Sequence, residues 1–340
     1  MVYGIVGASG VIGSKVSEYL ENKGKNILKA GRHYSFSGNE YCLDVYKEDE
    51  VREFVSKCDV VINCSGPSMK TSKSILPECL NQGKDYIDAF GWMPDITKVY
   101  IGNCRVVLNA GMVPGLPGIL AAYMKNYGAE KLILYSGGLE EGSRASLEDM
   151  LETSINGYSK PGFIVENGEL KRLSEPNLLL DESINLPEEC EISPLYTAEI
   201  EEINNILGFG NIENYNIFPN KKMRSYLMEG CMKYSQVKSK EEQESVIEDI
   251  LGKLKKVCEN KSFWYRFYLK AVSEYETQVI DIKTDNSAVI TSTVIGHIAK
   301  RLCEKKFDAG FYRPFEIADG QELLDELQSE GIDINIYGEI

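Results

Sequence analysis

Residues 1–13 constrain the fold of this chain more than any other segment. Val2–Val6 is a short apolar run that predicts a buried strand, and Ser14 to Asn22 has apolar side chains at helical spacing. The sequence GASGVIG lies between them, at residues 7–13. A strand, a glycine-rich turn and a helix in this order are typical of the first βαβ unit of a dinucleotide-binding domain. A tight turn that binds no ligand is the simpler alternative.

Each glycine of this turn has its own task in dinucleotide binding. Gly7 permits the tight turn, Gly10 lets the backbone approach a pyrophosphate, and Gly13 allows the helix to pack closely on the strand. The unpaired N–H groups at the start of the helix, together with its positive dipole end, bind phosphate. The predicted cofactor site therefore includes the whole turn: Gly7, Ala8, Ser9, Gly10, Val11, Ile12 and Gly13.

The end of the second predicted strand indicates which dinucleotide binds. This strand covers residues 26–31 and is followed by Arg32 and His33, with no acidic residue at its end. A site that prefers NAD usually places Asp or Glu there to bind the ribose 2′-OH, whereas a guanidinium binds a 2′-phosphate. We therefore expect NADP(H) in preference to NAD(H), held by Arg32. The alternative is a surface arginine at the end of a strand.

Two further strands, predicted over residues 41–45 and 59–64, add cofactor contacts. The side chain of Asp44 is expected near the adenine amino group. The fourth strand ends at the edge where an open parallel sheet binds its ligand. Cys64 is expected either beside the nicotinamide or packed in the core. The predicted cofactor site therefore gains Asp44, Val45, Cys64, Ser65, Gly66 and Pro67.

The order of predicted elements indicates an α/β protein. Strands over 85–88 and 105–109 alternate with helices over 47–56 and 71–82, which predicts a Rossmann-type, doubly wound parallel sheet. From about residue 119 the pattern changes to a less regular α+β segment, which contains two antiparallel strands at 263–269 and 277–282. A long apolar helix follows over 287–303. We therefore predict a Rossmann-type sheet with an inserted α+β domain.

Composition excludes several classes of function. A formal net charge of −15 argues against nucleic acids and anionic membranes as partners. No apolar stretch approaches the ~20 residues needed to span a bilayer, and no signal peptide precedes the first strand, so a cytoplasmic protein is expected. The nine cysteines are irregularly spaced and form no CxxC pair, and the chain has two histidines. We expect reduced thiols and no metal site.

Seven segments resemble, in order, the saccharopine dehydrogenase-like reductases. They are GASGVIG at 7–13, AGR at 30–32, VINCSGP at 61–67, CLNQGKDYIDAFG at 79–91, NAGMVPGLPG at 109–118, AGFYRPFEI at 309–317 and LLDELQSEGIDI at 323–334. The resemblance implies a nucleotide-binding domain formed by residues 1–118 and 285–340, and a substrate-binding and dimerisation domain over 119–284. It also implies NAD(P)-linked oxidoreduction of a small molecule.

The resemblance leaves the reaction open. Reduction of a C=N bond in a metabolite derived from an amino acid or amine is the expected activity. Reduction of an activated C=C bond by an enoyl reductase is the second possibility. A protein that binds NADP(H) as a sensor, without turnover, is the alternative from another class. A sensor would quench NADPH fluorescence and never consume the cofactor.

Tyr86 and Asp88 are the best-placed pair of titratable residues, because they lie on a strand that ends at the crevice. They are the predicted catalytic residues. A core tyrosine and a solvated turn acid are the favoured simpler interpretation. Two rival motifs fail on their position. Tyr234 and Lys238 match the Tyr-x-x-x-Lys spacing of short-chain dehydrogenases but lie far beyond the fifth strand. Cys104 follows an asparagine, as in semialdehyde dehydrogenases, but precedes a strand and not a helix.

The predicted hairpin over residues 263–284 is unusually aromatic. Alternation along its first strand places aromatic side chains on both faces, and a sheet with two apolar faces must have both covered. A homodimer is expected to cover one of them, as the family resemblance also implies. A strand buried inside one large domain is the alternative.

Overall fold

The computed structural model describes residues 1–34, 38–173 and 184–339. The chain forms two compact units. The first comprises residues 1–119 and 287–330, and the second comprises residues 120–286 and 331–340. Both units contain segments that are distant in the sequence, because α9 and the helices after it return the chain to the first unit.

The first unit is built on a parallel sheet whose strand order is β15-β6-β5-β4-β1-β2-β3. All residues of β4 and β5 are buried, as expected for strands covered on both faces. The strands are β1 (Val2–Val6), β2 (Asn26–Gly31), β3 (Glu40–Cys42), β4 (Val60–Asn63), β5 (Asp85–Asp88), β6 (Arg105–Val107) and β15 (Gly310–Tyr312). The predicted Rossmann-type sheet is thus confirmed.

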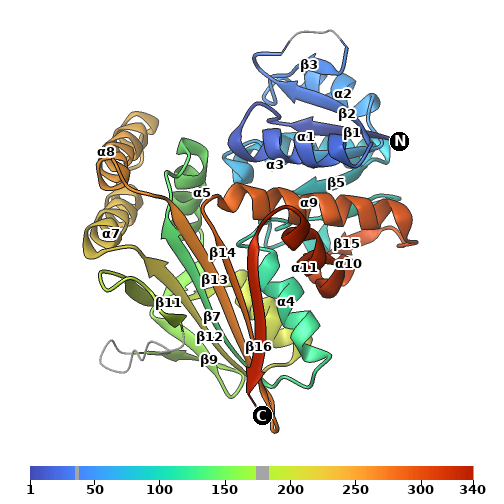
Figure 1. The fold of residues 1–340 in the computed structure, drawn as a ribbon. Helices are drawn as coiled ribbons and strands as arrows, with labels where there is room; N and C mark the ends of the chain where they lie inside the picture. The colour runs from blue at the N-terminus through green and yellow to red at the C-terminus, as the bar shows by residue number, and fades with distance from the viewer. Residues whose placement is uncertain (35–37, 174–183, 340) are drawn as a thin grey trace. The chain divides into compact units, whose positions relative to one another are not determined.

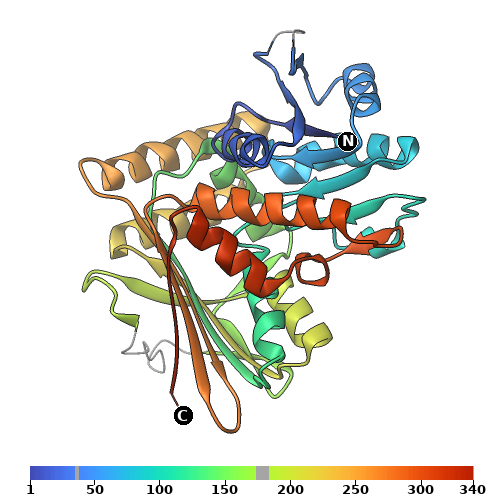
Figure 2. The same ribbon diagram turned by 45° about the vertical axis from the view of Figure 1, so that its right-hand side comes forward.

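Helices pack in groups around this sheet. α1 packs beside α9, and α9 beside α11, whereas α2 packs beside α3. Figures 1 and 2 show α9 (orange) and α11 (red) running side by side. The helices are α1 (Val11–Asn22), α2 (Glu48–Ser56), α3 (Ser68–Gln82), α9 (Ser287–Glu304), α10 (Pro314–Ile317) and α11 (Gly320–Ser329), with a short 3₁₀ turn η1 (Ile96–Lys98).

Two predicted strands are shorter than expected, each for a local reason. The strand predicted over 41–45 ends at Cys42, because the Asp44 carboxylate accepts a hydrogen bond from the Tyr46 N–H and starts a turn. The strand predicted over 105–109 ends at Val107, and Asn109 follows with a positive φ of 60°. Neither change moves the carboxyl edge of the sheet, where the predicted site lies.

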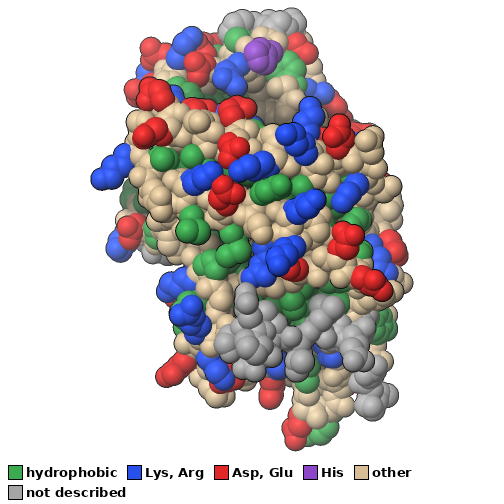
Figure 3. All heavy atoms as spheres, turned by 90° about the vertical axis from the view of Figure 1, so that its left-hand side faces the viewer, with side chains coloured by type: hydrophobic (Ala, Val, Ile, Leu, Met, Phe, Trp, Pro, Cys, Tyr) green, Lys and Arg blue, Asp and Glu red, His purple; other side chains and the backbone are tan. Residues whose placement is uncertain are grey.

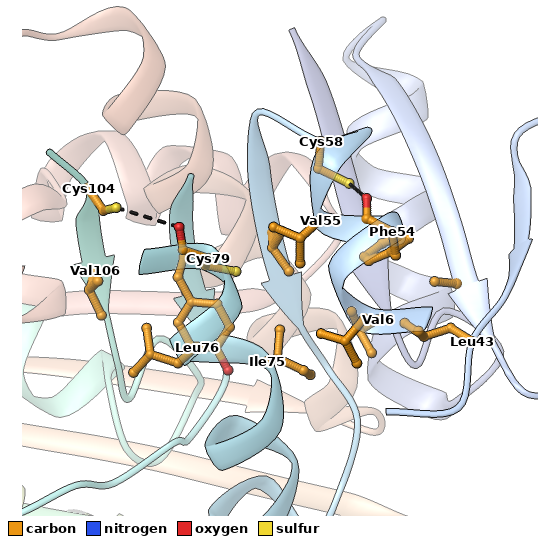
Figure 4. Close-up of a cluster of buried hydrophobic side chains, with 14 of the residues drawn as sticks. Val6, Leu43, Phe54, Val55, Cys58, Ile75, Leu76, Cys79, Cys104 and Val106 are labelled. Carbon is orange, nitrogen blue, oxygen red and sulfur yellow. Dashed lines mark hydrogen bonds between the residues drawn. The ribbon is translucent and has the colours of Figure 1, made fainter. Parts of the chain in front are cut away.

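Three cysteines of the first unit belong to its hydrophobic core. Figure 4 shows Cys58, Cys79 and Cys104 among Val6, Leu43 and other apolar side chains. Burial raises the pKa of the Cys58 and Cys79 thiols. These cysteines therefore act as small apolar residues in the core.

The second unit is built on a mixed sheet with the order β10-β9-β12-β7-β13-β14-β16, to which β11 and β8 are joined through β12. Helices α5, α7 and α8 pack together. Helix α4 (Leu116–Lys125) begins in the first unit and ends in the second. The other elements are β7 (Lys131–Leu139), α5 (Arg144–Ile155), β8 (Ser159–Pro161), β9 (Phe163–Glu166), β10 (Glu169–Arg172), β11 (Glu191–Thr197), α6 (Ala198–Glu202), η4 (Ile203–Leu207), β12 (Asn211–Phe218), α7 (Lys221–Gln236), α8 (Lys240–Cys258), β13 (Trp264–Val272), β14 (Thr277–Thr284) and β16 (Asp333–Glu339).

The C-terminal strand β16 corrects the predicted domain boundary. Residues 285–340 were expected to complete the nucleotide-binding domain, but β16 pairs antiparallel with β14 in the second sheet. The pairing places Ile334 opposite Ile282 and Ile336 opposite Ile280. These cross-strand apolar pairs explain why the chain end belongs to the second unit.

The aromatic strand β13 lies inside the second sheet, between β7 and β14. Phe267 and Tyr268 are fully buried, and the Tyr268 ring meets that of Tyr135 edge-on at 6.0 Å. Tyr135 in turn stacks on Tyr215 at 4.9 Å. These side chains therefore find partners within their own unit. The homodimer stays a prediction, and the aromatic strand no longer requires it.

No helix of the described residues is long and apolar enough to cross a membrane. On the face shown in Figure 3, basic and acidic side chains are interspersed. Within the described part of the chain, no group of three or more His, Cys, Asp and Glu side chains is placed to hold a metal ion.

Glu326 connects three helices of the first unit. Its carboxylate accepts hydrogen bonds from Tyr19 of α1 at 2.9 Å and from Lys300 of α9 at 2.6 Å, and it lies 2.9 Å from Nδ1 of the fully buried His297. The His297 Nε2 atom accepts the Asp319 N–H, so Nδ1 carries the proton that Glu326 receives. Burial raises the pKa of Glu326, but the hydrogen bonds lower it by more, to about 2. This cluster fixes α1, the helix that follows the glycine turn.

The Glu326 cluster should make stability depend on acid pH. Because the pKa of Glu326 is depressed in the folded state, its contribution is present above about pH 4.5 and is lost as the pH falls towards 2. The shift corresponds to at most about 3 kcal/mol. We expect Glu326→Gln to lower the free energy of unfolding at pH 7. Below about pH 4.5, the difference in free energy of unfolding between wild type and this variant should become smaller. Urea unfolding at several pH values measures this. A difference that is constant with pH would contradict it.

Candidate functional site

Two of the predicted cofactor segments, the glycine turn and the loop after β4, lie side by side at the switch point of the first sheet. β1 and β4 are neighbours, and the chain leaves β1 towards β2 but leaves β4 towards β5. Gly7 follows β1, and Cys64 follows β4. The Cys64 N–H donates to the Val6 carbonyl at 2.9 Å, and a Cβ on Gly7 would lie 2.8 Å from the Ser65 nitrogen. The glycine turn and the loop Cys64–Pro67 therefore form adjacent walls of the crevice where such sheets bind ligands.

The three glycines of the turn face different surroundings. Gly7 has a φ of +77°, which favours glycine, and its N–H donates to the Ala30 carbonyl at 2.9 Å. A Cβ on Gly13 would lie 2.2 Å from the Gly7 carbonyl oxygen. Gly10 is exposed and has an ordinary φ of −79°, and a Cβ there would meet only the Gly7 oxygen, at 3.2 Å. Gly7 and Gly13 are thus required for the fold of the turn. Gly10 has no such role, and its lack of a side chain leaves the outer surface of the turn open.

The start of α1 is suited to an anion. The N–H groups of Val11, Ile12 and Gly13 have no acceptor within the helix, as in the first turn of any α-helix. Gly10 is the N-cap and provides no side-chain cap, and the first turn has no acidic residue. These amides and the positive end of the helix dipole fit a pyrophosphate. The residues present therefore fit the dinucleotide that the sequence predicted.

The residue predicted to bind the 2′-phosphate lies at the carboxyl end of β2. Arg32 follows β2 and is exposed. The Ser9 hydroxyl lies 3.5 Å from where a Cβ on Gly31 would be, so the tip of the glycine turn reaches the same strand end. A guanidinium and a hydroxyl on one corner suit a phosphate.

Asp44 and Val45 lie beyond the next strand and have local roles. The Asp44 carboxylate accepts the Tyr46 N–H at 3.1 Å, and the Asp44 N–H donates to Glu50 at 2.8 Å. Val45 packs against the core of the unit. Their contact with adenine stays a prediction.

A buried polar network around Asp88 lies beneath the crevice. Asp88 and Tyr86 are fully buried. Burial raises the pKa of Asp88, and the hydrogen bonds that it accepts oppose that rise. The five donors to its carboxylate are Tyr86 Oη at 2.5 Å, Ser72 Oγ at 2.6 Å, Asn63 Nδ2 at 2.8 Å, Ser68 Oγ at 3.1 Å and the Phe90 N–H at 3.1 Å.

This network positions the loop after β4. Asn63, held by Asp88, accepts hydrogen bonds from the Ser65 hydroxyl at 2.6 Å and the Ser65 N–H at 3.1 Å. Thr71 of α3 donates to the Ser65 carbonyl at 3.0 Å. Tyr86 and Asp88 are both enclosed, and their side chains are hydrogen-bonded to each other. Their geometry fits a role in shaping the crevice, and the catalytic role stays a prediction.

Cys64 lies at the edge of the crevice and is partly exposed. Burial of its sulfur, and then the charge of Asp88, raise the pKa of the Cys64 thiol. A raised pKa disfavours the thiolate, which is the nucleophilic form of cysteine. Its position after β4 remains compatible with a wall of the cofactor site.

Sequence reasoning missed Asn63, Ser68 and Ser72. A signal existed in Asn63, which is a polar residue inside an apolar run that ends a strand. Ser68 and Ser72 carried no such signal, because serines at the start of a helix are usually solvated.

The second unit has its own cavity, of about 840 Å³, on the sheet face formed by β13, β14 and β16. Arg266 in its wall pairs with Asp281 through two hydrogen bonds of 2.7 and 2.8 Å and also donates to the Ile184 and Asn185 carbonyls. These two buried charges therefore satisfy each other within the cavity wall.

Comparison with known proteins supports the fold of the whole chain, and a family model matches part of its first unit. The NAD dependent epimerase/dehydratase family matches residues 4–79, from β1 through most of α3. No curated protein matches the chain. Saccharopine dehydrogenase (L-Glu forming) from Saccharomyces cerevisiae is 11% identical, with each chain covered completely and a TM-score of 0.70. An engineered D-amino acid dehydrogenase bound to NADP⁺ is 15% identical, with 97% of this chain and 98% of that chain covered and a TM-score of 0.49.

The chain therefore has the fold of saccharopine dehydrogenase over its full length. The predicted resemblance to saccharopine dehydrogenase-like proteins is confirmed at the level of the fold. The matched family places the glycine turn in a segment similar to that of NAD dependent proteins.

A substitution at Gly10 should change ligand binding without changing the fold. We expect Gly10→Val to fold, because its φ is ordinary and its Cβ has one close neighbour, but to weaken NADPH binding at least about tenfold, because the side chain occupies the pyrophosphate position. Fluorescence titration with NADPH and a thermal melt measure the two effects. Gly252→Val in α8, where a Cβ meets nothing within 4 Å, is the control and should bind NADPH as wild type does. Wild-type affinity in Gly10→Val would refute the assignment of this turn.

Proposed function

We propose that this protein is an NADP(H)-dependent reductase of a C=N bond in a metabolite derived from an amino acid or amine. The observation that carries the proposal is the crevice at the β1–β4 switch point, where free helix N–H groups, an open Gly10 and Arg32 line one path. These groups are of the kinds that bind the phosphates of NADP(H).

Each part of the crevice has a binding task. The N–H groups of Val11–Gly13 hold the pyrophosphate, and Arg32 with Ser9 holds the 2′-phosphate. The loop Cys64–Pro67 forms the wall beside the nicotinamide half, and the Asp88 network keeps this loop in place. When bound, NADPH supplies a hydride to an electrophilic carbon of the substrate.

Reduction of C=N also requires a proton at nitrogen. Tyr86 and Asp88 do not donate it directly, because both are enclosed. A charged group of the substrate or a water molecule is the proposed donor. The second unit is the proposed substrate-binding part.

The full-length likeness to a saccharopine dehydrogenase supports a C=N substrate over a C=C substrate. Purified protein should consume NADPH when given an imine formed from an α-keto acid and an amino acid, and should form one NADP⁺ for each C–H bond made. Gly10→Val serves as the inactive control. Faster consumption with an enoyl thioester would favour C=C reduction. Quenching of NADPH fluorescence without consumption of either substrate would indicate a sensor.

Arg32 should decide the choice of cofactor. We expect Arg32→Ala to weaken NADPH binding by about 1.5–3 kcal/mol, the range for a charge-assisted hydrogen bond, and to change NADH binding much less. Titration of both cofactors measures this. Arg52→Ala, which removes an exposed arginine of α2, should change neither affinity. Equal losses for NADPH and NADH would assign Arg32 a general packing role.

A further inference from the structure

Asn109 has an unusual backbone at the carboxyl end of β6. Its φ of 60° is rare for a residue other than glycine, and asparagine is among the few that tolerate it. The neighbouring backbone fixes this conformation. The Asn109 N–H donates to the Phe90 carbonyl at 2.6 Å, the Ala110 N–H donates to the Asp88 carbonyl at 2.9 Å, and a Cβ on Gly115 would lie 2.5 Å from the Asn109 carbonyl oxygen.

The side chain of Asn109 carries a second anomaly. Its Oδ1 atom is buried and has no hydrogen-bond partner among the described residues. The residue as a whole is partly exposed. A strained backbone and an unpaired amide oxygen both cost free energy, and they persist together mainly where a site is preorganised for a ligand.

The position of β6 indicates which part of a ligand would approach. A Rossmann-type sheet binds a dinucleotide across two halves, and β4, β5 and β6 form the half opposite the adenine side. Asn109 follows the third strand of that half, two residues after Val107. The nicotinamide ring carries one hydrogen-bonding substituent, a primary carboxamide, which offers both an acceptor and N–H donors.

We propose that the Asn109 side-chain amide binds the carboxamide of the nicotinamide ring of NADP(H). An asparagine amide presents the same donor and acceptor set, so the two groups satisfy each other. This inference rests on the proposed function, because it requires that the crevice binds NADP(H). It adds the residue that orients the nicotinamide half.

The test uses two ligands that share the adenine half. Asn109→Gly keeps the left-handed backbone and removes only the amide. It should raise the Kd for NADP⁺ about tenfold and leave the Kd for adenosine 2′,5′-bisphosphate unchanged, because the latter has no nicotinamide half. Asn260→Gly is the matched control, because Asn260 has a φ of 56°, is exposed and lies beyond α8 in the second unit. It should leave both Kd values unchanged.

Several outcomes would overturn the inference. An unchanged Kd for NADP⁺ in Asn109→Gly would do so, as would equal losses for both ligands. If wild type binds neither ligand, the proposed function itself fails. If Asn109→Gly does not fold, Asn109→Asp replaces it, compared on NADP⁺ and on nicotinic acid adenine dinucleotide phosphate. The aspartate should disfavour the acid analogue more strongly than asparagine does, through charge repulsion. If the ratio of the Kd values for these two ligands is the same in Asn109→Asp as in wild type, the proposed contact between residue 109 and the carboxamide is contradicted.

Discussion

The close contact between the glycine turn and the loop after β4 is the constraint on which the candidate site depends. Gly7 leaves no room for a Cβ against Ser65, and Gly13 leaves none against the Gly7 carbonyl. These contacts bring the start of α1 and the loop Cys64–Pro67 to the same edge of the sheet. Gly10 remains open on the outside, so a phosphate can approach the helix amides there.

The buried Asp88 network keeps one side of this contact in place. A carboxylate without exposure to water is costly unless it is well hydrogen-bonded, and Asp88 receives five donors from β4, α3, β5 and the following backbone. Removal of any one element would leave a buried polar group unpaired. The network therefore couples the packing of α3 and β5 to the position of Ser65.

The sequence was most informative where the pattern is local. The run Val2–Val6, the glycine turn and the apolar helix over 287–303 gave the first βαβ unit and the returning helix, because spacing alone encodes their burial. The strand β16 could not be predicted, because its partner β14 lies some 50 residues away and only the pairing of isoleucines selects it. The roles of Tyr86 and Asp88 were equally hidden. Whether a carboxylate is exposed or enclosed depends on Asn63, Ser68 and Ser72, which three-dimensional packing brings together.

The central claim is that the amides at the start of α1 hold the pyrophosphate of NADP(H). Hydrogen–deuterium exchange with and without NADPH tests it most directly, because the N–H groups of Val11, Ile12 and Gly13 have no acceptor in the helix. The account predicts that exchange at these amides slows when NADPH binds, together with that at Ser9. Unchanged exchange at these residues in the presence of saturating NADPH, or protection confined to the second unit, would contradict it.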